Sequence, residues 1–104
     1  SAREALKQAE IALAAAERAE GTKLKVANRV LAQIYKLPQK SSVKWVKLYH
    51  VYTQAERGWQ HAQMAAKDAY VARLHAYIDY QDACIDGADV ELAVERACNA
   101  DLSD

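Results

Sequence analysis

"REALKQAEIALAAAERAE", from Arg3 to Glu20, is the stretch that decides the fold class of this 104-residue chain. Six of its alanines, counting Ala2 just before it, recur three and four residues apart, at positions 2, 5, 9, 12, 16 and 19. That spacing is typical of one face of an α-helix, and Ser1 with Glu4 has the spacing of a capping box at its start. A methyl group buries little apolar surface, but small side chains let two helix axes approach closely. We therefore expect this alanine face to pack against another helix face made of small side chains.

The apolar spacing continues past Gly21, although glycine often follows the last residue of a helix. We therefore expect helix on both sides of Gly21, either as one bent helix or as two helices in line. Pro38 forces a stop, since proline cannot donate the helical hydrogen bond. The turn "PQKSS" begins there, and Ser41 or Ser42 is the expected N-cap of the next helix.

The region after this turn has no strong helix breaker before Asp86 and Gly87. Two sets of residues recur every seven positions in it, which predicts a second long helix with coiled-coil-like packing. Gly58 lies inside this pattern and is a candidate position for a kink. The two sets are Leu48, Ala55, Ala62, Ala69, Ala76 and Ala83, and Trp45, Tyr52, Trp59, Ala66, Arg73 and Tyr80.

A short third helix is expected at the C-terminus, with Gly87 as the C′ residue before it and Asp89 as its N-cap. Its apolar positions are Val90, Val94, Ala97 and Cys98. The sequence thus predicts one all-α domain over residues 1–104, a long antiparallel helical hairpin with a short third helix. We expect helix over more than about two-thirds of the residues, well above the usual third.

Bulky residues are expected to stabilise the two ends of this hairpin, because an alanine seam contributes little apolar burial per turn. A layer of large side chains is expected to pack at each end. The layers are Leu31, Ile34, Trp45, Tyr49 and Tyr52 near the turn, and Leu13, Leu74, Tyr77, Ile78 and Ile85 at the other end.

Charge is unevenly distributed, although the net charge is zero. The segment 22–47 holds seven basic residues and no acidic one, whereas the segment 79–104 holds eight acidic residues and one basic residue. A straight helix from Ser42 to Asp86 would separate the two groups by ~65 Å. Charges that distant are screened from each other in salt, so we expect the basic end to bind an acidic surface.

The expected partner is a protein with an acidic surface, and a homodimer is a second possibility because thin helical hairpins often pair. Nucleic acid is disfavoured, since Arg29 is the only arginine of the basic run and the lysines straddle a turn. No apolar run is long enough to span a membrane. The candidate partner-binding residues are Lys36, Lys40, Lys44, Trp45, Lys47 and Tyr49.

Catalytic motifs are lacking: no serine has a neighbouring histidine, and the three glycines form no phosphate-binding loop. The sequence favours a non-enzymatic protein with no cofactor and no metal. One alternative remains, a metal or acid/base site on the helix stripe His75, Asp79, Asp82 and Asp86, because His and Asp four residues apart share a helix face. It has no second ligand pair of the Glu-x-x-His type.

Cys84 and Cys98 would be a candidate disulfide in a secreted protein and two thiols in the cytosol. In a tight hairpin that turns at Gly87, Cys84 lies opposite residue 90. Cys98 would then be ~12 Å further along, at 1.5 Å per residue. Bridged Cα atoms lie within about 7 Å of each other, so this geometry predicts free thiols.

Two segments near the C-terminus resemble a known family. "YIDYQDAC" (Tyr77–Cys84) is similar to a Tyr-Arg-Asp-Ala-Glu-Cys segment of the LprI-like lysozyme-inhibitor domains, and "CNADLS" (Cys98–Ser103) to their later Cys-x-x-x-Leu-Thr segment. "AERGW" (Ala55–Trp59) is a fainter match to their Arg-Ala-Trp. The resemblance implies a small, helical, exported, disulfide-linked domain, some members of which are taken to inhibit lysozyme.

Overall fold

The computed structural model describes residues 1–38, 42–88 and 98–99. It contains helix α1, Ala2–Tyr35, of 34 residues, and helix α2, Val43–Ala88, of 46 residues. The two helices hold more than two-thirds of the chain, and the described residues include no strand, so the all-α expectation is confirmed. The third helix expected from Asp89 onward lies outside the described residues, apart from Cys98 and Asn99.

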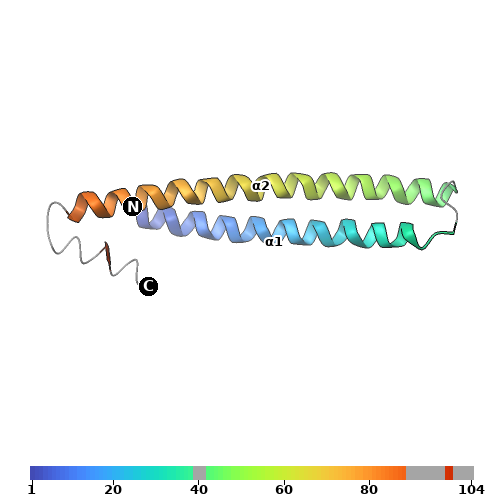
Figure 1. Cartoon of the computed structure of the whole chain (residues 1–104), viewed down its shortest axis with the longest axis horizontal. Coiled ribbons are helices and arrows are strands. Elements are labelled where there is room, and N and C mark those ends of the chain that lie inside the picture. The colour runs from blue at the N-terminus through green and yellow to red at the C-terminus, as the bar shows by residue number, and fades with distance from the viewer. Residues whose placement is uncertain (39–41, 89–97, 100–104) are drawn as a thin grey trace. The chain divides into compact units, whose positions relative to one another are not determined.

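The chain divides into two compact units. The first unit combines Ser1–Leu13 with Ala69–Asp104, and the second is Ala14–Asp68. In each unit a stretch of α1 lies beside a stretch of α2 that runs in the opposite direction (Figure 1). The second unit also contains the connection between the helices and is therefore a helical hairpin.

Both helices begin at a serine N-cap. The Ser1 Oγ accepts a hydrogen bond from the Glu4 backbone N–H at 3.2 Å, and the Ser42 Oγ accepts one from the Trp45 backbone N–H at 3.1 Å. Each bond satisfies a backbone donor that has no partner within the helix. Ser42, rather than Ser41, is therefore the residue that starts α2.

The C-terminus of α1 tightens into a turn before Pro38. The N–H groups of Lys36 and Leu37 donate to the carbonyls of Gln33 and Ile34, three residues earlier, at 3.3 and 3.1 Å. Such bonds satisfy the last carbonyls of a helix when the α-helical ladder cannot continue. The predicted stop at Pro38 is confirmed.

Glycine does not interrupt either helix. Gly21 lies inside α1 and Gly58 inside α2, and no described glycine has a positive φ. Of the two arrangements expected around Gly21, the structure has one continuous helix. The expectation that Gly87 follows the end of a helix is wrong, because the backbone keeps helical φ and ψ there and α2 continues to Ala88.

Replacing Gly21 with alanine should stabilise the protein. A Cβ built at Gly21 has no neighbour within 4 Å, so the added methyl meets no obstacle. Alanine in a helix interior is about 1 kcal/mol more favourable than glycine. We expect Gly21→Ala to raise the melting temperature by roughly 4–8 °C, measured by circular dichroism. An unchanged or lower melting temperature would show that α1 is not one continuous helix at this position.

The packing face of α1 differs from the predicted alanine seam. Ala5, Ala12 and Ala19 are exposed, whereas Leu6 and Leu13 are half-buried. A leucine removes more apolar surface from water than an alanine, so the helix is turned to alternate leucine with alanine on its inner face. The partly or fully buried residues of this face are Ala2, Leu6, Ala9, Leu13, Ala16, Glu20, Ala27, Val30, Leu31 and Ile34.

The packing face of α2 follows the predicted heptads. Eleven of the twelve predicted positions, from Trp45 to Tyr80, are at least half-buried. The exception is Ala83, which is exposed while Cys84 takes its place on the inner face. Four apolar residues form the buried core of the described part of the chain: Ala27 and Tyr80, each 4% exposed, Ala66 at 7% and Ile34 at 9%.

Candidate protein-binding site

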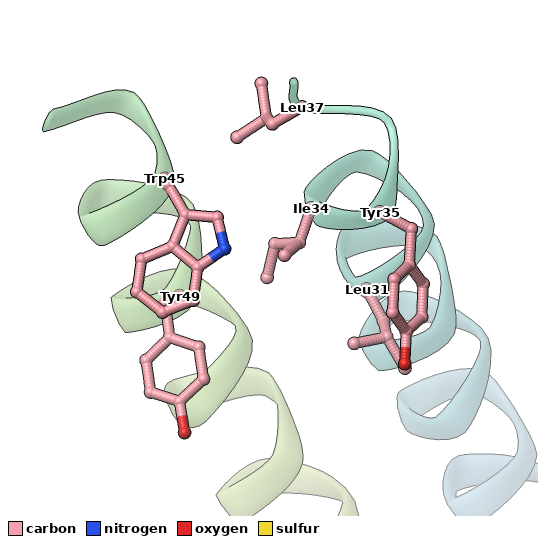
Figure 2. A pocket seen from close by; sticks show the side chains of 6 residues that line it. All are labelled: Leu31, Ile34, Tyr35, Leu37, Trp45 and Tyr49. Atoms are coloured by element: carbon pink, nitrogen blue, oxygen red, sulfur yellow. The ribbon is translucent and has the colours of Figure 1, made fainter. Parts of the chain in front are cut away.

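A half-open pocket of about 220 Å³ lies in the second unit, beside the connection between the two helices. Figure 2 shows that side chains from the end of α1 and from the start of α2 form its walls. Its lining is entirely apolar or aromatic and consists of Leu31, Ile34, Tyr35, Leu37, Trp45 and Tyr49.

The wall formed by α2 is a stack of aromatic rings. The rings of Trp45 and Tyr49 are 5.1 Å apart and nearly parallel, at 13°. Tyr49 in turn meets Tyr52, with ring centroids 6.4 Å apart and an angle of 45°. Residues three and four apart share a helix face, which explains why these three rings meet. The stack gives the pocket a flat and rigid wall.

The opposite lip of the pocket is formed by a tyrosine that is mostly in contact with solvent. Tyr35 is 78% exposed, and Tyr49 across from it is 50% exposed. Because each phenol ring carries a large apolar area and a polar hydroxyl, it can cover an apolar group of a ligand while its O–H remains in water. The two rings therefore provide apolar surface that the isolated chain leaves uncovered.

Tyr52 connects the aromatic stack to an acidic side chain. Its O–H donates a hydrogen bond of 2.7 Å to Oε2 of Glu56, one turn further along α2. This bond to the carboxylate raises the pKa of Tyr52, and burial and the Glu56 charge act in the same direction. Tyr52 therefore stays protonated well above neutral pH, which keeps Glu56 bonded within its own helix.

The predicted partner-binding residues fall into two groups. Trp45 and Tyr49 line the pocket, whereas Lys36, Lys44 and Lys47 are exposed and do not. At about 100° per residue, Lys44 and Lys47 lie on one face of α2, and Tyr49 points about 140° or more away from both. Lys40 lies outside the described residues.

The lysines of α2 add to a positive field at its N-terminus. No acidic residue lies in the first turn of α2, and Lys44 is part of it. The unpaired N–H groups at a helix N-terminus carry a partial positive charge, which attracts anions. The beginning of α2 is therefore electrostatically suited to an acidic surface, on a face other than that of Tyr49.

Four pocket residues were not among the predicted binding residues: Leu31, Ile34, Tyr35 and Leu37. Leu31 and Ile34 were expected in the packed layer near the turn, where they do lie. Their helical spacing gives no sign that part of this layer is open to solvent. The signal that was available is the position of Tyr35 three residues before Pro38, since a large side chain at the end of a helix has few neighbours to cover it.

The alternative site on α2 has exposed side chains at three of its four positions. His75, Asp79 and Asp82 are exposed, and the part of the chain that is described contains no group of three or more His, Cys, Asp or Glu able to hold a metal ion. The side chain of Asp86 is not described. Cys84 is half-buried and carries a free thiol. The hairpin arm on which the prediction of free thiols was based lies outside the described residues, and α2 runs through Gly87 without the expected turn.

No protein-family model, curated protein or solved structure matches the chain. Neither α1 nor α2 contains a stretch that is both long and apolar enough to cross a lipid bilayer.

Proposed function

We propose that this protein is a non-enzymatic interaction module that binds a partner protein at the connection between its two helices. The open aromatic pocket in the second unit carries the proposal. A large apolar side chain of the partner would insert between Tyr35 and Tyr49, and separate acidic residues of the partner would reach Lys36 and, on another face of α2, Lys44 and Lys47. This is the usual composition of a protein interface, with an apolar aromatic centre and a charged rim.

The size of the pocket favours a side chain over a small-molecule ligand. Pockets for drug-sized ligands and cofactors usually measure about 300–1,000 Å³ and bury most of the ligand. The pocket here is about 220 Å³ and half-open, with no charged residue in its lining. It has room for one bulky side chain, and the remaining affinity would come from the surrounding surface.

Removing one tyrosine ring from the pocket should abolish most of the partner binding. Tyr49 is half exposed, so Tyr49→Ser opens no core cavity, but it removes the stacked wall. Central aromatic residues of interfaces commonly contribute 2 kcal/mol or more, so we expect binding to weaken about 30-fold or more. The measurement is affinity capture from a lysate, with mass spectrometry to identify the partner and titration of that partner afterwards.

Tyr70→Ser is the matched control for this experiment. Tyr70 is 52% exposed and lies on the same helix, in the other unit. The Tyr70→Ser variant should bind the captured partner as tightly as the unmodified protein does. If Tyr49→Ser binds normally while Tyr70→Ser does not, the interface is not at the pocket and the proposal fails.

The resemblance to LprI-like domains supports a second candidate, an exported inhibitor of lysozyme. In that case the ligand is lysozyme itself, and the two main segments of the resemblance, Tyr77–Cys84 and Cys98–Ser103, belong to the first unit, whereas the pocket residues belong to the second. A direct titration with lysozyme separates the two candidates, since only this one predicts binding that Tyr49→Ser leaves unchanged.

A further inference from the structure

The end of α2 in the first unit has a second apolar face. Of the layer expected here, Leu13 is half-buried, but Leu74, Tyr77, Ile78 and Ile85 are 36%, 41%, 54% and 59% exposed. The expected layer is wrong because the inner face of α2 is already occupied by its heptad residues, among them Ala76 and Tyr80. At about 100° per residue, Ile78 points about 160° away from Tyr80.

This second face has a heptad pattern of its own. Val71, Ile78 and Ile85 are seven residues apart, and Leu74 and Gln81 lie between them at the matching positions. The resulting 3-4-3-4 spacing is that of a coiled-coil seam, with β-branched residues at a and leucine or glutamine at d. Helix α1, by contrast, has its apolar residues gathered much more strongly on one side than α2 has. A contiguous apolar patch left exposed on a helix commonly marks an interaction surface.

We propose that this stripe, defined as Val71, Leu74, Ile78, Gln81 and Ile85, is the interface between two copies of the chain, paired as a parallel two-stranded coiled coil. Among parallel coiled coils, β-branched residues at a with leucine at d favour two strands over three or four. The proposal is independent of partner binding at the pocket, because all five residues belong to the other unit.

Gln81 sets the direction of the pairing. In a parallel pair in register, Gln81 meets the second copy's Gln81, and the two amides can bond to each other. In an antiparallel pair the d position of one copy meets an a position of the other, so Gln81 would face a valine or isoleucine, and a buried amide without a partner is costly. A single polar residue in a coiled-coil seam commonly fixes register in this way.

The area of the stripe and of the two tyrosines beside it is sufficient for a modest dimer. Six large side chains contribute, each between 36% and 59% exposed: Tyr70, Val71, Leu74, Tyr77, Ile78 and Ile85. Side chains of this size expose on the order of 500 Å² together at these fractions, so two copies bury on the order of 1,000 Å². That is the size at which specific protein interfaces begin, so we expect weak association rather than a permanent dimer.

A charged residue in the stripe tests this directly. The unmodified protein should be dimeric at high micromolar concentration in sedimentation equilibrium, and Ile78→Glu should raise the dissociation constant by about 100-fold or more, because two carboxylates would meet in the seam. The control is Ile11→Glu, the same change at an isoleucine of α1 that is 61% exposed and lies in the same unit. It should leave the dimer intact.

A cysteine placed in the seam gives a readout that does not depend on weakening the fold. With Cys84 and Cys98 replaced by serine, Gln81→Cys should form a covalent dimer on mild oxidation, since a parallel pair brings the two positions together. Ala72→Cys, exposed and outside the stripe, should not. A monomeric unmodified protein, or a dimer that survives Ile78→Glu, would overturn the proposal.

Discussion

Ala66→Glu is expected to destabilise the fold severely. Ala66 is 7% exposed and lies at a heptad position of α2, where the second unit packs its two helices together. A glutamate there would either bury an uncompensated charge or force the helices apart, at a cost of roughly 3–5 kcal/mol. A small domain has only about 5–15 kcal/mol of stability in total. The melting temperature should fall by about 15 °C or more.

The neighbouring residue provides the control. Ala65 is an exposed alanine of the same helix, so Ala65→Glu adds the same charge to the same turn without burying it. The melting temperature of the Ala65→Glu variant, measured by circular dichroism, should lie within a few degrees of that of the unmodified protein. Equal effects of the two substitutions would mean that α2 does not pack through its heptad face.

Reversing two lysines is the second change with a large expected effect. The double substitution Lys44→Glu with Lys47→Glu places two acidic side chains where the proposed partner is acidic. Opposed like charges at an interface cost several kcal/mol, so we expect binding of the captured partner to weaken by about 100-fold. Acidic residues in the first turn of a helix interact favourably with its N-terminus, so helicity should be unchanged or slightly higher. Lost binding would therefore not reflect unfolding.

Arg57→Glu with Lys67→Glu is the matched control, because it makes the same charge change at two exposed positions of α2 beyond the basic segment 22–47. Partner binding should be nearly normal in this variant. For the unmodified protein, raising salt from about 0.05 to about 0.5 M should weaken binding, because exposed charges are then screened. If binding does not depend on salt and the Lys44→Glu, Lys47→Glu variant still binds, the lysines do not contact the partner. The pocket would then be the remaining proposed contact, and the proposal of an acidic partner would fail.

Much of the fold was predictable because its signals are local. The heptads of α2, the serine N-caps and the proline stop each follow from spacing or backbone chemistry within a few residues. The rotation of α1 about its axis was not predictable, because alanine and leucine both recur at helical spacing. Only packing against α2 determines which of the two sets faces inward. Leu6 and Leu13 were favoured because they bury more surface than Ala5 and Ala12.

The candidate site was only half predictable for a related reason. Trp45 and Tyr49 stand out in the sequence as aromatic residues within a basic run. Their spacing does not show that they face Tyr35 across an open pocket, because that depends on where α1 ends relative to α2. The lysines were grouped with them by proximity in the sequence, but on a helix neighbouring positions point in different directions.

Hydroxyl-radical footprinting of the chain, alone and with its captured partner, tests the proposed binding site most directly. Oxidation of each tyrosine is read by mass spectrometry. We expect the partner to protect Tyr35 and Tyr49, which are 78% and 50% exposed in the isolated chain, and to leave Tyr70 unchanged. Protection of Tyr70 without protection of Tyr35 and Tyr49 would contradict the proposed site.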